Sequence, residues 1–229
     1  MTLKAYRESI IACLSGEPLD AVLAEVLQWP PHRAISPLIA CLFHGDEKVR
    51  WHAVSALGAI TATLAETNPE AARTVVHRLM WSLNAESGSI GWGAPEVLAE
   101  IMAIHGGFAE EFGHMLVAYM RPDGCYIEFP ILQRGLMWGL GRLAGTRPDV
   151  LNGWDASIYL PPYLNSEDPE VRGLAARALG LLKVNVAKER IEALKEDPAK
   201  FLLYNQGVLT PVTVGSLAGA ALKQISSDR

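Results

Sequence analysis

Two segments of the chain repeat the same pattern, and this repetition constrains the fold more than any other sequence feature. Residues 46–60 read DEKVRWHAVSALGAI and residues 168–182 read DPEVRGLAARALGLL, with Asp, Val-Arg, Ala and Ala-Leu-Gly at identical spacing. Weaker copies of the Ala-Leu-Gly pattern lie between and after these segments. The equivalent position of the pattern, which we call the marker, occurs five times, at Gly58, Ala99, Gly141, Gly180 and Ala218.

The spacing of these markers is nearly constant. Successive markers are 41, 42, 39 and 38 residues apart, which is typical of repeats that contain two helices. In the first repeat we predict a first helix over 35–43, a polar turn over 44–46 and a second helix over 47–66. Asp46 and Asp168 are expected to cap second helices, because a carboxylate accepts hydrogen bonds from the free amides at a helix start. Proline favours the first helical position, and further helices are expected to start at Pro31, Pro69, Pro148 and Pro169.

The repeated segments also carry a family resemblance. Residues 168–182 closely resemble the HEAT-like repeat of phycobilisome lyases, and residues 46–60 are nearly as similar. Repeats two and three depart from the motif, since Ile90-Gly91 and Leu132-Gln133 stand in place of Val-Arg. The resemblance implies an all-α, right-handed α-solenoid of about five HEAT-like helix pairs. It leaves the activity open, because HEAT-like proteins include scaffolds, bilin lyases, metal-dependent hydroxylases and DNA glycosylases.

The organisation of the chain follows from where the marker occurs. Residues 1–33 lack it, and helices that begin near Thr2 and Pro18 are expected to form an N-terminal helical cap. Residues 34–229 are expected to form the solenoid as one continuous domain.

Composition and motifs exclude several classes of function. The chain has 20 Lys and Arg against 25 Asp and Glu, for a net charge of -5, so no nucleic-acid partner is predicted. Three scattered cysteines without a CxxC pair favour the reducing cytoplasm, and no apolar run is long enough to span a membrane. None of the six histidines is followed by Glu, as in the iron ligands of HEAT-like hydroxylases, and no HExxH motif is present. We therefore predict no metal and no cofactor, and catalysis is left open as the less favoured alternative.

The second helices supply the candidate site. At 100° per residue, Val171, Ala175 and Leu182 face the core of the fourth repeat, whereas Gly173 and Arg177 face away from it. Second helices line the concave surface of a HEAT-type stack, so this outward stripe is expected to form the wall of a groove. Three of the six tryptophans fall on the stripe. The candidate binding residues are Trp51, Trp92, Glu96, Glu100, Arg134, Trp138, Arg142 and Arg177.

Aromatic and arginine side chains are typical of binding hot spots. The favoured function is therefore a protein-interaction scaffold or adaptor that binds a protein or peptide segment in its concave groove. Two alternatives remain open. In one, the tryptophans pack between repeats, and the pairs Glu100–Arg142 and Trp92–Arg134 join neighbouring repeats. In the other, repeats two and three enclose a small-molecule or cofactor pocket, with or without lyase-like catalysis, lined by Trp92, Glu96, Arg134 and Trp138.

Two smaller features complete the prediction. Arg50 and Arg172 are expected to tie each repeat to a turn carboxylate of its neighbour. The glycine-rich helix that contains Gly135, Gly139 and Gly141 is expected either to permit close helix packing or to leave room for a ligand beside Trp138.

Overall fold

The structure is a computed structural model of the 229-residue chain, and it describes residues 3–84 and 90–227. The chain divides into two compact units. Unit 1 comprises Met1–His105 and Tyr204–Leu209, and unit 2 comprises Gly106–Leu203 and Thr210–Arg229. The single continuous domain over residues 34–229 and the separate cap over residues 1–33 stay predictions.

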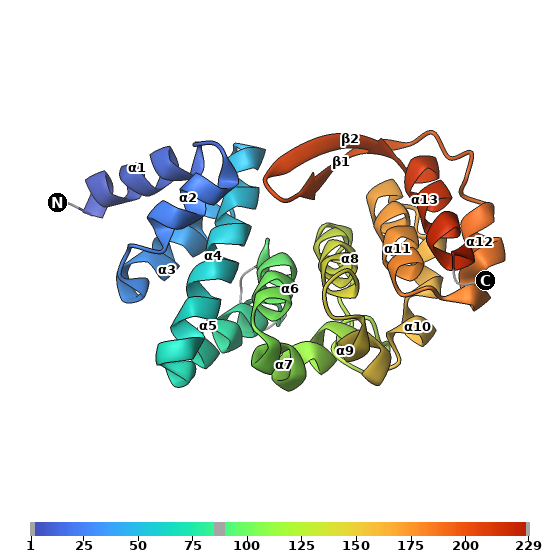
Figure 1. Ribbon diagram of the computed structural model, residues 1–229, viewed down its shortest axis with the longest axis horizontal. Helices are drawn as coiled ribbons and strands as arrows, with labels where there is room; N and C mark the ends of the chain where they lie inside the picture. The colour runs from blue at the N-terminus through green and yellow to red at the C-terminus, as the bar shows by residue number, and fades with distance from the viewer. Residues whose placement is uncertain (1–2, 85–89, 228–229) are drawn as a thin grey trace. The chain divides into compact units, whose positions relative to one another are not determined.

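Unit 1 contains helical pairs that follow two N-terminal helices (Figure 1). The long helix α4 packs against α3, α5 and α6, and α1 and α2 also contact it. The first pair is therefore α3 with α4, and the second is α5 with α6. The bounds are α1 Leu3–Leu14, α2 Leu19–Val26, α3 Pro31–Cys41, α4 Glu47–Thr67, α5 Pro69–Ser82 and α6 Ala94–Ile104.

Unit 2 is built around three second helices, α8, α11 and α13, which lie side by side (Figure 1). The first helix of the fourth repeat is broken into α9, α10 and the 3-10 turn η2, because Gly153 and the pair Pro161-Pro162 interrupt it. The bounds are α7 Gly106–Ala118, α8 Pro130–Ala144, α9 Pro148–Gly153, α10 Ala156–Tyr159, η2 Pro161–Asn165, α11 Pro169–Leu181, η3 Asn185–Ala187, α12 Lys188–Glu192 and α13 Val214–Ser226.

The helix starts agree with the sequence. All five markers lie in second helices, namely α4, α6, α8, α11 and α13. Asp46 Oδ1 accepts hydrogen bonds from the backbone amides of Lys48 and Val49 at 2.8 and 3.3 Å. Asp168 accepts the equivalent bonds at 3.0 and 3.3 Å. The helices predicted to begin at proline do so at Pro31, Pro69, Pro148 and Pro169.

The Val-Arg arginines hold the turn before each motif helix. Arg50 Nη1 donates to the carbonyl oxygens of His44 and Gly45, and Arg172 Nη1 donates to those of Ser166 and Glu167. Arg172 Nε also donates to Asp197 Oδ2 at 2.7 Å. The predicted tie to a carboxylate of the following repeat is therefore present at Arg172.

The marker glycines sit at close approaches between helices. A Cβ atom at Gly180 would lie 2.5 Å from the backbone Cα of Ala221, so α11 and α13 pack almost backbone to backbone. A Cβ atom at Gly58 would lie 2.5 Å from Cγ of Glu100, which is a side-chain atom. Both glycines allow packing that a larger residue would disturb.

A β-hairpin interrupts the helical pattern of the last repeat. Strands β1 (Lys200–Asn205) and β2 (Val208–Thr213) form a two-stranded sheet. Gln206 and Gly207 make the turn with positive φ angles of 45° and 87°, as two-residue hairpin turns require. The pattern of helix pairs does not predict these strands, whereas the Gln-Gly pair flanked by aromatic and β-branched residues specifies a hairpin.

Candidate functional site

The eight candidate residues are divided between the two units. Unit 1 contains Trp51, Trp92, Glu96 and Glu100, and unit 2 contains Arg134, Trp138, Arg142 and Arg177. Three predictions each combine residues of both units and stay predictions. They are the pairs Glu100–Arg142 and Trp92–Arg134 and the pocket between repeats two and three.

Trp51 is covered by the hairpin tip. Its ring stacks on Tyr204 of β1, with centroids 4.7 Å apart and planes 9° from parallel. Ser55 Oγ and the Tyr204 hydroxyl form a hydrogen bond of 2.8 Å one turn further along α4. The expectation that this part of α4 faces an open groove is therefore wrong, because the chain supplies its own aromatic side chain there. A binding role for Trp51 stays a prediction.

Trp92 lies in the turn before α6 rather than on the helix, and its side chain is 41% exposed. Phe43, which follows α3, is 50% exposed and stacks on Trp92 with ring centroids 6.2 Å apart. The turn that joins Trp92 to α6 depends on Gly93, whose φ of 76° is in the left-handed region that favours glycine. A Cβ atom at Gly93 would also lie 3.0 Å from the side chain of Leu42. Sequence reasoning missed Phe43, because it lies between the two helices of its repeat and outside the outward stripe.

The two glutamates of α6 differ in exposure. Glu100 is 9% exposed, and its aliphatic carbons occupy the space that Gly58 leaves open on α4. Glu96 is half-buried, and its Oε2 atom is enclosed by protein. The stripe was expected to be exposed, which is wrong for Glu100, because residues 97–102 of α6 are buried on all sides. Binding roles for both stay predictions.

Arg134 is engaged in ion pairs at the start of α11. Its Nε atom donates to Asp168 Oδ2 at 2.8 Å, and its Nη1 atom lies 3.5 Å from Glu170 Oε2. Arg134 therefore joins α8 to the turn of the next repeat, as the Val-Arg arginine was expected to do. Gln133, which occupies the Val-Arg position in this repeat, donates to the Ile127 carbonyl oxygen instead.

Trp138 belongs to the core of unit 2. Its side chain is 4% exposed, and residues 135–141 of α8 are all buried. The expectation of an exposed tryptophan is wrong, because a helix that is buried all round has no solvent-facing stripe for periodicity to identify. The alternative in which this tryptophan packs inside the fold accounts for its burial, and a binding role for Trp138 stays a prediction.

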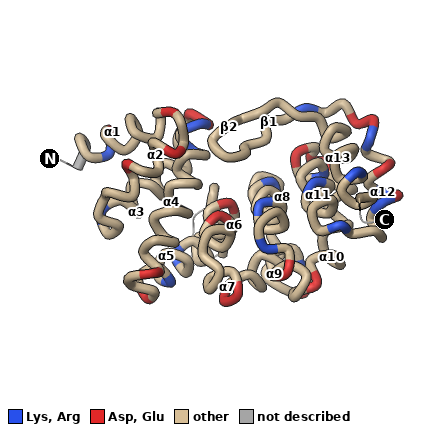
Figure 2. Tube along the Cα trace, viewed as in Figure 1, with Lys and Arg blue, Asp and Glu red and all other residues tan. Residues whose placement is uncertain are grey.

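Arg142 and Arg177 bring two positive charges together on adjacent helices. Figure 2 shows the Lys and Arg positions along α8 and α11. A Cβ atom at Gly141 would lie 2.5 Å from Nη1 of Arg177, so this glycine leaves room for the guanidinium. Burial lowers the pKa of Arg177, and the neighbouring charge of Arg142 lowers it further. Both side chains are half-buried.

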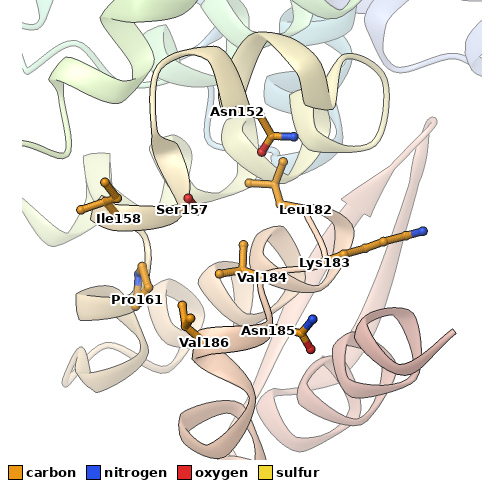
Figure 3. A pocket seen from close by; sticks show the side chains of 9 residues that line it. All are labelled: Asn152, Ser157, Ile158, Pro161, Leu182, Lys183, Val184, Asn185 and Val186. Carbon is orange, nitrogen blue, oxygen red and sulfur yellow. The ribbon is translucent and has the colours of Figure 1, made fainter. Parts of the chain in front are cut away.

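A pocket of about 470 Å³ opens elsewhere in unit 2 (Figure 3). Its walls are largely apolar, and the amine of Lys183 extends away from the other lining side chains in this view. Apart from Lys183, the polar residues that line the pocket are neutral. It is lined by Asn152, Ser157, Ile158, Pro161, Leu182, Lys183, Val184, Asn185 and Val186.

Within residues 3–84 and 90–227, His, Cys, Asp and Glu form no group of three or more that could hold a metal ion. Among the helices of this described part of the chain, none has the length and apolar character needed to cross a bilayer.

Comparison with known proteins shows the fold. No known protein family matches the chain. An uncharacterized protein of Archaeoglobus fulgidus is 31% identical over 109 residues, a match that spans 48% of this chain and 53% of that protein. The chain therefore aligns with about half the length of this relative.

Solved structures match over nearly the whole chain. An engineered protein from the Northeast Structural Genomics Consortium has a TM-score of 0.55 at 20% identity, over 99% of this chain and 100% of that one. Armadillo repeat proteins designed for modular peptide recognition give 0.51 at 19% identity, over 95% and 99%. A designed armadillo repeat protein in complex with the peptide (KR)4 gives 0.53 at 17% identity, over 95% and 98%. The chain has a helical-repeat fold.

Proposed function

We propose that this helical-repeat protein is a scaffold that binds a peptide or protein segment. The observation that carries the proposal is the pair of exposed, stacked aromatic rings of Phe43 and Trp92 in unit 1. Large aromatic side chains leave water favourably when a partner covers them, and they dominate the energy of many interfaces. Their mutual stacking also limits the side-chain entropy that binding would cost.

The structural neighbours support the same function. Two of them are designed armadillo repeat proteins, one for modular peptide recognition and one in complex with (KR)4. The resemblance to phycobilisome-lyase type HEAT-like repeats belongs to this proposal, since scaffolds are one of the kinds of protein built from such repeats. A cytoplasmic location belongs to it too, on the basis of the cysteine pattern.

Selection from a random library tests the proposal. The full chain is immobilised and presented with random octapeptides displayed on phage, and the affinity of selected peptides is measured by fluorescence anisotropy. We expect selected peptides to bind Phe43→Ala and Trp92→Ala at least about tenfold more weakly, because each variant removes a hot-spot ring. Trp81→Ala is the matched control, since Trp81 is another exposed tryptophan of unit 1.

Two results would contradict the proposal. One is the absence of any peptide that is enriched above an empty support. The other is unchanged affinity of the selected peptides for the Phe43→Ala and Trp92→Ala proteins. Circular dichroism of each variant establishes that it is folded, which is expected because both rings lie at the surface.

A further inference from the structure

The tip of the β-hairpin covers part of α4 in unit 1 through one buried side chain. Tyr204 is 3% exposed, whereas the other residues of β1 and β2, all of which the structure describes, are half-buried or exposed. The Tyr204 ring stacks on Trp51, and its hydroxyl bonds to Ser55 of the same helix. Tyr204 therefore lies against α4 as a bound side chain lies in a binding site.

Three residues of α4 match the shape and the chemistry of this tyrosine. Trp51 contacts the face of the ring, with centroids 4.7 Å apart, and the His52 ring lies edge-on to it with centroids 6.5 Å apart. Ser55 Oγ lies 2.8 Å from the Tyr204 hydroxyl oxygen. We call Trp51, His52 and Ser55 the tyrosine slot. A phenylalanine would deprive the buried Ser55 hydroxyl of this partner, so the slot favours a tyrosine.

The hairpin holds Tyr204 on an extended backbone that presents one side chain to the slot. Leu203 is half-buried and Asn205 is exposed, because successive side chains of a strand point to opposite faces. The sheet that carries Tyr204 has two strands, and such a hairpin is marginally stable without further packing. Segments with few buried contacts open at a lower free-energy cost than global unfolding. We therefore expect the hairpin tip to leave α4 before the helices unfold.

We propose that the tyrosine slot binds a tyrosine side chain from an extended segment of a partner protein, and that Tyr204 fills the slot when the partner is absent. The inference rests on the proposed function and names the chemistry of one recognised residue, although it uses residues of unit 1 other than Phe43 and Trp92. In the structure the slot is covered by the chain itself. A partner reaches it only after the hairpin tip has lifted from α4, so the hairpin acts as an autoinhibitory contact.

Competition between Tyr204 and the partner follows from this arrangement. A competitor on a short tether has an effective concentration in the millimolar range, and the hairpin itself tethers Tyr204. The partner segment therefore binds more weakly to the wild-type chain than to a chain whose slot has been emptied. The hairpin also supplies a probe, since residues 200–213 carry the tyrosine in the sequence KFLLYNQGVLTPVT.

The test measures the affinity of a fluorescein-labelled peptide of residues 200–213 for the whole Tyr204→Ala chain by fluorescence anisotropy. We expect binding at least about tenfold tighter than to the wild-type chain. Replacement of the peptide's tyrosine by Ala should weaken binding at least about tenfold. Replacement by Phe should weaken it about fivefold, because the hydrogen bond to Ser55 is lost.

A second substitution in the Tyr204→Ala chain tests the slot itself. Trp51→Ala should weaken binding of the peptide at least about tenfold, because it removes the surface on which the tyrosine ring stacks. Trp81→Ala is the matched control, since Trp81 is an exposed tryptophan of unit 1, and it should leave the affinity unchanged.

Hydrogen exchange on the wild-type chain gives a measurement that needs no variant protein. Excess unlabelled peptide should displace the hairpin tip, so the backbone amides of residues 204–209 should exchange at least about twofold faster. The same peptide with Ala in place of its tyrosine should leave their exchange rates unchanged. The test therefore stands even where Tyr204→Ala fails to fold.

The outcomes separate this inference from the scaffold function. A peptide that does not bind, that binds without need of its tyrosine, or that binds both chains equally would overturn the inference and leave the library selection on Phe43 and Trp92 standing. A wild-type chain that is dimeric by light scattering, and monomeric as Tyr204→Ala, would assign the slot to the hairpin of a second copy and would also overturn it. Tyrosine-dependent binding that Tyr204→Ala strengthens and Trp51→Ala weakens would support it.

Discussion

The two copies of the repeated segment, in α4 of unit 1 and α11 of unit 2, share one skeleton of hydrogen bonds. Asp46 and Asp168 cap their helices, and Arg50 and Arg172 donate to the two turn carbonyls that precede the cap. The cap and the turn are therefore built in the same way in both units, by residues that are close in sequence.

The copies differ at the outward positions. After the Val-Arg pair, α4 has Trp51, which stacks on Tyr204. At the same position α11 has Gly173, where a Cβ atom would lie 2.9 Å from the ring of Phe201. In each unit an aromatic side chain of β1 covers the outward position of the helix. In unit 1 this ring, Tyr204, stacks on the large side chain of Trp51, whereas in unit 2 the ring of Phe201 lies against Gly173, which has no side chain. The shared residues thus fix the helix pair, and the variable residues fix what covers it.

The largest expected effect concerns the marker glycines. Gly180→Ala should lower the free energy of unfolding by about 2 kcal/mol, because overpacking against the Ala221 backbone outweighs the better helix propensity of alanine. Gly58→Ala should lower it by less, about 1 kcal/mol, because Cγ and Cβ of Glu100 lie 2.5 and 3.0 Å from the added Cβ and the Glu100 backbone lies farther away, at 3.4 Å. Urea unfolding measures both, and equal losses would break this contrast between the copies.

Removal of the Val-Arg arginines gives the next effect. Arg172→Ala should cost about 1.5 kcal/mol, since it removes charged hydrogen bonds to Asp197 and to two carbonyls. Arg50→Ala should cost about 1 kcal/mol or less, because its ion pair with Glu47 is long and exposed. The measurement is again urea unfolding at neutral pH, and a larger loss for Arg50→Ala would contradict the assigned roles.

The ion pair between Arg172 and Asp197 predicts that the stability of the fold depends on pH. The hydrogen bond from Arg172 holds the pKa of Asp197 below its usual range. Ionised Asp197 therefore stabilises the fold above the ordinary aspartate pKa, and this stability is lost as pH falls through the lowered pKa. The stability difference between wild type and Arg172→Ala should shrink below about pH 4. A difference that stays constant from pH 7 to pH 3 would show that Asp197 contributes nothing.

The smallest expected effect concerns the contact between Tyr204 of the hairpin and helix α4. Tyr204→Phe should cost about 1 kcal/mol, because it removes the hydrogen bond to Ser55 between two buried groups. Ser55→Ala is the partner variant, and the double variant should cost less than the sum of the two single variants. Additive losses in this thermodynamic cycle would mean that the two hydroxyls act independently.

The local features that the two copies share were predicted from the sequence, whereas several contacts at the candidate site were not. The repeat period was predicted from markers that are 38 to 42 residues apart in the sequence. The caps at Asp46 and Asp168 and the proline helix starts were also predicted, because each depends on residues a few positions apart. The β-hairpin was missed although its Gln-Gly turn signals it. At the site, the sequence marked Arg177 and Trp92 as candidates but not Phe43, because stacking between two turns leaves no periodic signal.

The sequence by itself determined the helix pairs and the residues that start them, since hydrogen bonds within a turn and apolar periodicity along a helix are local. Only the tertiary structure decided which outward side chains are covered. Ser55 and Tyr204 are 149 residues apart in the chain yet share a hydrogen bond, and Trp138 is buried because its helix is enclosed on all sides. Burial depends on segments that are distant in sequence, which a helical wheel drawn for one repeat cannot include.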